Sequence, residues 1–152
     1  MVRIGKVSLF LLALALMLTG ASVSQAQSFD TEQVIRAYFG AAATLDVEAT
    51  VALFAPEGVL EDPVGTPANR GHKAIREHLQ AITAPFTGLD FDIHRIWIVS
   101  PTEAAASWTL TIHPRAGQDI VIEGVATFVF NDAGQIRSVR EYWELADLLS
   151  QL

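Results

Sequence analysis

The sequence predicts an α+β fold in which three N-terminal helices pack on a curved, mostly antiparallel sheet. Between residues 31 and 83, apolar residues recur at helical spacing, and from Leu89 onward the pattern changes to that of strands rich in Ile, Val, Thr, Phe and Trp. The turn-forming stretches SPTE, HPRAGQ and NDAGQ separate these strands. A sheet that curls around helices forms a cone, and we expect an apolar cavity at its open end.

The helices are placed by their capping and terminating residues. Ser28 or Asp30 can cap the first helix, Asp46 can cap the second, and Pro85 closes the third. The expected helices are Thr31–Thr44, VEATVALFA ended by Pro56 and Gly58, and His72–Thr83. The expected strands are Val59–Asp62, Leu89–Val99, Glu103–His113, Asp119–Phe130 and Gln135–Trp143, and Leu145–Leu152 is expected to be a short helix or a frayed tail.

Residues 1–26 have the pattern of a signal peptide. Arg3 and Lys6 precede an uncharged apolar run, VSLFLLALALML, and Ser24-Gln25-Ala26 offers small residues at the cleavage positions. The run is shorter than the roughly 20 residues that span a bilayer, although an uncleaved anchor is the alternative. Cleavage after Ala26 predicts one periplasmic or secreted domain over residues 27–152, with no membrane attachment.

Charge and composition exclude several classes of function. Without Arg3 and Lys6, the basic count falls from 10 to 8 against 17 acidic residues, a net charge of −9, which argues against nucleic acid and anionic membranes as partners. The chain has no cysteine, so disulfides and thiol chemistry are excluded. The four histidines show no metal-ligand spacing, and no metal or organic cofactor is expected.

The stretch VLEDPVGTP places two carboxylates, Glu61 and Asp62, at the end of an apolar run. Strand alternation separates them: if Leu60 faces the core, Asp62 shares its face and Glu61 points outward. A carboxylate at the rim of an apolar cavity can act as a general base. The alternative is that Asp62 only accepts hydrogen bonds from the amides of its own turn.

Tyr38 lies on the apolar face of the first helix, so its hydroxyl needs a partner when it is buried. In a dry cavity a phenol can donate to a developing oxyanion; the alternative is a bond to a backbone carbonyl. Trp108 and Trp143 are large enough to line a steroid-sized cavity. The full set of side chains expected to bind substrate is Phe54, Leu60, Trp108, Ala126, Phe128 and Trp143.

Two segments resemble a known family. YFGAAATLDVEATVALFAPEGVLEDPVGTPANRGHKAIREHL resembles the N-terminal half of bacterial ketosteroid isomerases, within the NTF2-like or SnoaL-like superfamily, and TFVFNDAGQIRSVREYW resembles the closing hairpin of that family. The resemblance implies an NTF2-like cone, a small apolar or steroid-like substrate, and a homodimer formed through the outer face of the sheet.

The resemblance also implies roles for individual residues. Asp62 corresponds to the base that moves a proton between two carbons, and Tyr38 to the donor that stabilises the dienolate oxygen. The family pairs this Tyr with a protonated Asp, but Ala126 occupies that position here, and Glu123 has the opposite strand parity. Losing one oxyanion donor costs about 2.7–4 kcal/mol of transition-state stabilisation.

Three functions therefore remain open. The first is an isomerase with Asp62 as base and Tyr38 as donor, and the second is a periplasmic NTF2-like protein that binds a small ligand without turnover. The third is cyclase or epoxide hydrolase chemistry, in which Asp62 would act with Arg95, Arg137 or Arg140.

Overall fold

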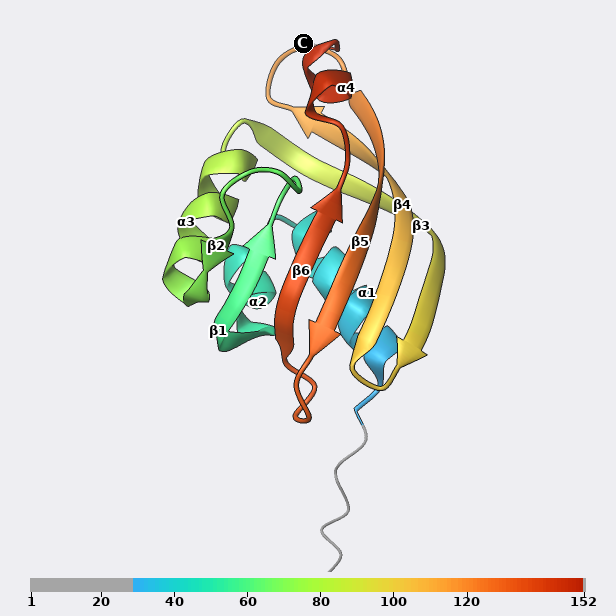
Figure 1. The fold of residues 1–152 in the computed structure, drawn as a ribbon. Coiled ribbons are helices and arrows are strands. Elements are labelled where there is room, and N and C mark those ends of the chain that lie inside the picture. The colour runs from blue at the N-terminus through green and yellow to red at the C-terminus, as the bar shows by residue number, and fades with distance from the viewer. Residues whose placement is uncertain (1–28, 152) are drawn as a thin grey trace, which may run out of the picture.

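A curved six-stranded sheet with the order β2-β1-β6-β5-β4-β3 is the frame of the protein (Figure 1). The computed structural model describes residues 29–151, and the expected signal peptide lies outside them. The strands are β1 (Phe54–Glu61), β2 (Asn69–Arg70), β3 (Phe86–Ser100), β4 (Glu103–Pro114), β5 (Ile120–Phe130) and β6 (Ile136–Tyr142). Helices and sheet together give the α+β class that the sequence predicts.

The sheet is mixed. Strands β3 to β6 form an antiparallel meander, whereas β1 pairs with β6 in parallel, with Leu60 beside Val139 and Glu61 beside Arg140. This pairing brings the end of β1 next to the end of β6, although 80 residues separate Glu61 from Glu141 in the chain.

Strand β1 is longer than expected, and the second helix is correspondingly shorter. Strand β1 includes Pro56 and Gly58, which were expected to end the helix. The register of β1 against β6 shifts between Phe54 and Val59. An added Cβ at Gly58 would lie 2.9 Å from the carbonyl oxygen of Ala55. A bulge tolerates both a proline and a close backbone approach, so the strand continues where the local sequence indicated a stop.

The helices are α1 (Thr31–Ala43), α2 (Val47–Ala52), α3 (Gly71–Thr83) and α4 (Leu145–Leu149). Asp30 caps α1 by accepting from the amide of Gln33, and Asp46 caps α2 by accepting from that of Ala49. In Figure 1, α1 lies behind the sheet, α2 and α3 lie beside β1, and α4 lies near the start of β5. Within residues 29–151, none of these helices has the length and apolar character needed to cross a bilayer.

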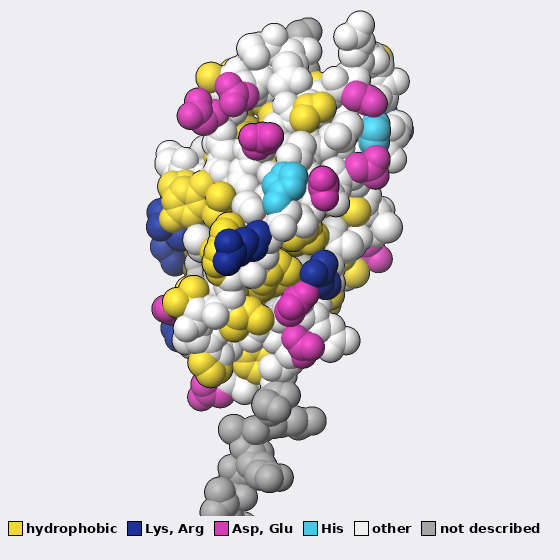
Figure 2. Space-filling model, turned by 90° about the vertical axis from the view of Figure 1, so that its right-hand side faces the viewer, with side chains coloured by type: hydrophobic (Ala, Val, Ile, Leu, Met, Phe, Trp, Pro, Cys, Tyr) yellow, Lys and Arg dark blue, Asp and Glu magenta, His cyan; other side chains and the backbone are white. Residues whose placement is uncertain are grey.

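The core between α1 and the sheet is aromatic. Tyr38 and Phe39 project from α1, and the ring of Phe128 meets the ring of Tyr38 edge-on at 5.4 Å. Phe128 in turn stacks on Phe130. The surface also carries exposed apolar side chains. On the side of the molecule shown in Figure 2, hydrophobic side chains lie among basic ones, with acidic groups above and below.

Gly124 makes room for Trp108, and its substitution tests this packing. A Cβ at Gly124 would lie 2.4 Å from the Trp108 ring and 2.9 Å from the Tyr142 carbonyl oxygen. Gly124→Ala should therefore lower the free energy of unfolding by about 1–3 kcal/mol and displace Trp108. The matched control is Gly40→Ala in α1, where nothing lies within 4 Å and stability should be unchanged or higher. Denaturant unfolding and Trp fluorescence measure both effects, and equal stability of the two variants would contradict the packing argument.

Candidate active site

A cavity of about 400 Å³ lies between the helices and the concave face of the sheet, which is within the usual range for small-molecule sites. It is predominantly apolar. Its walls are formed by Tyr38, Ala42, Leu45, Val47, Thr50, Asp62, Pro63, Leu79, Ala81, Ile82, Thr83, Pro85, Phe86, Leu89, Phe91, Trp108, Leu110, Ile112, Ile122, Glu141, Trp143, Leu145 and Leu148.

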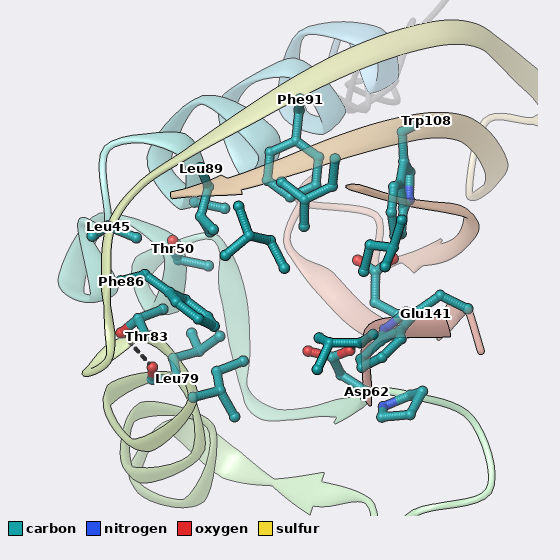
Figure 3. A pocket seen from close by; sticks show the side chains of 18 of the residues that line it. Leu45, Thr50, Asp62, Leu79, Thr83, Phe86, Leu89, Phe91, Trp108 and Glu141 are labelled. Carbon is teal, nitrogen blue, oxygen red and sulfur yellow. Dashed lines mark hydrogen bonds between the residues drawn. The ribbon is translucent and has the colours of Figure 1, made fainter. Parts of the chain in front are cut away.

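The polar groups gather at one end of this cavity. Figure 3 shows Asp62, Glu141 and Trp108 on one side, across from Leu45, Thr50 and Phe86. The hydroxyls of Thr50 and Thr83 are already bonded to backbone carbonyls of their own helices. Among the described residues, the lining includes no Lys, Arg or His. The cavity thus has an apolar body and one acidic, aromatic end.

Asp62 follows β1 directly and faces into the cavity. Its Oδ1 accepts a hydrogen bond of 2.7 Å from Nε1 of Trp143, and its Oδ2 lies 3.6 Å from Nε2 of His78. The side chain is 16% exposed, so the carboxylate remains reachable from the cavity. Its partner is thus a side chain of the same cavity, whereas a turn-capping role would have engaged the amides of its own turn.

Glu61 points the other way. It accepts from the Gly65 amide at 2.9 Å and from Arg140 Nε at 2.8 Å, and these two bonds hold the pKa of its carboxyl below the ordinary value. The adjacent acids therefore lie on opposite faces of the strand, as alternation predicts.

Tyr38 is buried and hydrogen-bonded to an acid that the sequence reasoning missed. Its hydroxyl is bonded to Oε1 of Glu141 at 3.0 Å. Burial raises the pKa of Tyr38 well above its ordinary value, and the carboxyls of Glu141 and Asp62 raise it further. At neutral pH the phenol is therefore a hydrogen-bond donor rather than a phenolate.

The carboxyl of Glu141 is also strongly perturbed. It is 6% exposed, and burial, followed by the charge of Asp62, raises its pKa to about 8. Hydrogen bonding from Tyr38 and from the Trp108 indole lowers the pKa only partly. The carboxyl is therefore mostly protonated at neutral pH, which is the usual response of a buried acid without a cation.

A strand pattern could have revealed Glu141. Its Cα pairs with that of Ala126 across β5 and β6, so the two residues share the inner face with Val139. The family resemblance points to Ala126 and the outward Glu123 on β5, whereas the acid lies on the neighbouring strand, opposite Ala126. A charged residue at an inward position of β6 was the available signal.

The predicted binding residues divide into two groups. Trp108 and Trp143 line the cavity, whereas Phe54, Leu60, Ala126 and Phe128 are core residues outside the lining. The reason is that the ring of Tyr38 lies against Phe54 and Phe128, so its hydroxyl reaches the polar end while these rings fill the space behind it.

The arginines proposed for hydrolase chemistry lie elsewhere. Arg140 pairs with Glu61, Arg95 lies over the Trp97 ring, and Arg137 is exposed on β6. None of them lines the cavity. Within residues 29–151 there is also no cluster of three His, Asp or Glu side chains arranged to hold a metal ion.

Comparison with known proteins identifies the family. The model of the SnoaL-like domain matches residues 35–139. The chain belongs to the SnoaL-like domain family. A steroid Delta-isomerase of Nocardioides simplex is 29% identical over 123 residues, which cover 80% of this chain and 96% of that enzyme.

Solved structures share the SnoaL-like fold. A Mycobacterium tuberculosis protein in complex with estradiol-17beta-hemisuccinate is 25% identical, with a TM-score of 0.68 over 76% of this chain and 95% of that one. The epoxide hydrolase/cyclase-like enzyme SalBIII, which acts in pyran ring formation in salinomycin, is 21% identical, with a TM-score of 0.68 over 77% of this chain and 92% of that one. The latter likeness shows the fold alone.

The burial of Glu141 predicts a pH-dependent stability. Its folded-state pKa lies above the ordinary value of 4.5, so the folded chain retains a proton that the unfolded chain releases between about pH 4.5 and pH 8. The free energy of unfolding of the wild type should therefore fall across this window, relative to Glu141→Gln, by on the order of a few kcal/mol. Denaturant unfolding at several pH values measures this difference. The control Glu123→Gln, on the outer face, should follow the wild type, and a Glu141→Gln curve parallel to it would refute the assignment.

Proposed function

We propose that the protein is an isomerase that moves a proton next to a carbonyl group of a small apolar substrate, with Asp62 as the base and Tyr38 as the oxyanion donor. The observation that carries this proposal is that both side chains line one cavity, at its polar end. The steroid Delta-isomerase relative supports the reaction class, and the estradiol-hemisuccinate complex of the M. tuberculosis protein supports a steroid-like ligand.

The geometry suits the two halves of such a reaction. Asp62 is fixed by the Trp143 indole through Oδ1. Its Oδ2, 3.6 Å from His78 Nε2, would take a proton from carbon and return it to a neighbouring carbon. The negative charge that develops on the substrate oxygen meets neutral donors in an apolar enclosure, where hydrogen bonds are stronger than in water. The apolar body of the cavity would hold the rest of the substrate.

Substitution of the base and the donor tests this function. With a Δ5-3-ketosteroid, Asp62→Asn should lower kcat by about 10²–10⁴-fold, because the amide cannot accept the proton. Tyr38→Phe should lower kcat by about 10²–10³-fold. The rise in conjugated-enone absorbance measures both rates.

Matched controls lie on the outer face of the protein. Asp92→Asn and Tyr142→Phe change the same residue types at exposed positions and should retain the wild-type rate. An enone signal that is absent from the wild type, or that survives Asp62→Asn, would overturn the isomerase proposal.

A second candidate follows from the two acids at the polar end. A neutral Glu141 beside Asp62 could protonate an epoxide oxygen while Asp62 activates a hydroxyl or water, which is the chemistry of a cyclase or hydrolase. Ligand binding without turnover remains the non-catalytic alternative. It predicts that Asp62→Asn binds a steroid as tightly as the wild type and that neither protein forms product.

A homodimer through the outer sheet face is a further part of the proposal. Trp97, Val121, Val125 and Tyr142 are each more than a third exposed. The register places Val125 beside Tyr142 on neighbouring strands. Sedimentation of the wild type and of Val125→Glu tests the dimer: the substitution should shift the protein toward monomer, and identical profiles would count against this interface.

A further inference from the structure

The polar end of the cavity contains a hydrogen-bond network whose direction can be worked out. Glu141 is bonded through Oε1 to the Tyr38 hydroxyl at 3.0 Å. The Trp108 indole N–H faces the same carboxyl, which it influences as a hydrogen-bond donor. Trp108 Nε1 and Glu141 Oε2 are both buried, and neither has a partner at hydrogen-bond distance. Figure 3 shows the Glu141 side chain directed toward Trp108.

The donors and acceptors of Trp108, Glu141 and Tyr38 determine where their hydrogens lie. An indole can only donate, whereas a neutral carboxyl has one carbonyl acceptor and one O–H donor. Trp108 acts on this carboxyl as a donor, and Oε2 is its unpartnered oxygen, so we assign Oε2 as the acceptor for the Trp108 N–H and place the acid hydrogen on Oε1. The Tyr38 hydroxyl donates to Oε1 when Glu141 is a carboxylate. With the acid hydrogen on Oε1, the same 3.0 Å contact runs in the opposite direction, and the Tyr38 oxygen accepts. The hydroxyl hydrogen of Tyr38 is then left without a protein partner, at the surface of the cavity.

We propose that Glu141 is a positioning residue: as a neutral acid held by Trp108, it donates to the Tyr38 oxygen and so leaves the Tyr38 hydrogen for a carbonyl or enolate oxygen of the ligand. The consequence for catalysis rests on the proposed function, but the network itself does not. A donor that is itself hydrogen-bonded in this way is strengthened, because successive hydrogen bonds polarise one another.

Loss of the Glu141 proton would reverse the network. A carboxylate only accepts, so the Tyr38 hydrogen would turn to Oε1 and would no longer be available to the ligand. The raised pKa of Glu141, about 8, places this change just above neutral pH. The titratable groups around it are Tyr38 from α1, Asp62 after β1 and, behind Asp62, His78 from α3, whereas β5 contributes the apolar Ala126.

The same network restricts the ligand. Two acids, Asp62 and Glu141, lie at this end, and the described lining contains no Lys, Arg or His, so an anionic ligand group there would find no cation among the lining residues. The site therefore suits a neutral molecule with an acceptor oxygen, such as a ketone or enone on an apolar skeleton. A ligand carboxylate would have to lie at the other end or outside the cavity.

Glu141→Gln and Glu141→Leu distinguish a positioning role of Glu141 from a purely structural one. The Gln amide preserves the pattern, because its oxygen accepts from Trp108 and its NH₂ donates to Tyr38, and it does not ionise. Leucine removes both functions at similar volume. Glu123→Gln is the control for the substitution itself, since Glu123 is exposed on β5.

The first measurement is the absorbance of a bound 4-en-3-one steroid, whose maximum moves to longer wavelength when its oxygen accepts a strong hydrogen bond. We expect this shift in the wild type and in Glu123→Gln below about pH 8 and its loss above. Glu141→Gln should show it at every pH, and Glu141→Leu and Tyr38→Phe should show little at any pH. A shift in Glu141→Gln that still disappears near pH 8 would overturn the proposal.

The second measurement is kinetic. For a Δ5-3-ketosteroid, the kcat of the wild type should decline above about pH 8, and Glu141→Gln should lack this decline. Glu141→Leu should lower kcat roughly tenfold, with a smaller effect on KM. An equal alkaline decline in the wild type and Glu141→Gln would overturn the proposal.

A third measurement needs neither turnover nor a ligand. In protein labelled with ¹³C-glutamate, the carboxyl signal missing from Glu141→Gln should titrate near pH 8, and titration near 4.5 would overturn the proposal. If the wild type leaves the Δ5-3-ketosteroid unchanged, the isomerase function fails, while the carboxyl titration still decides the role of Glu141.

Discussion

A carboxyl group buried without a cation governs the polar end of this cavity. Glu141 cannot be both desolvated and ionised beside Asp62 at low cost, so the proton stays on Glu141 and the charge stays on the more exposed Asp62. The two acids thereby acquire different properties from their surroundings alone. One can accept a proton and the other can donate a hydrogen bond, and the roles of Tyr38 and Trp108 follow from that division.

Strand pairing produces this arrangement. The parallel pairing of β1 with β6 brings Asp62 next to Glu141, and the antiparallel pairing of β6 with β5 places Ala126 opposite Glu141. Ala126 is fully buried, so a small side chain there leaves the inner face to the longer Glu141. Gly124 has the same relation to Trp108, because any side chain at 124 would overlap the indole. The small residues Gly124 and Ala126 on β5 therefore leave room for Trp108 of β4 and Glu141 of β6.

Local patterns predicted much of the fold and only part of the site. Alternation along the long strands and the caps at Asp30 and Asp46 are local, and they agree with the structure to within a few residues. Strand β1 continued through Pro56 because it pairs with β6, a contact that no local pattern encodes. Glu141 was missed for the same reason: its importance comes from Ala126 and Tyr38, both distant in sequence. The interior position of Phe128, behind Tyr38, also depends on tertiary packing.

The fold is shared by SnoaL-like proteins with different activities, so the chemistry must be argued from the polar end. An arginine beside the substrate would favour a localised oxyanion or an anionic ligand, and the described lining contains none. A neutral donor such as Tyr38, supported by a protonated Glu141, stabilises delocalised charge without binding a carboxylate tightly in the ground state. An enolate conjugated over several atoms is such a charge. These groups therefore favour the proposed isomerase reaction, in which negative charge develops transiently on the oxygen of a neutral ketone.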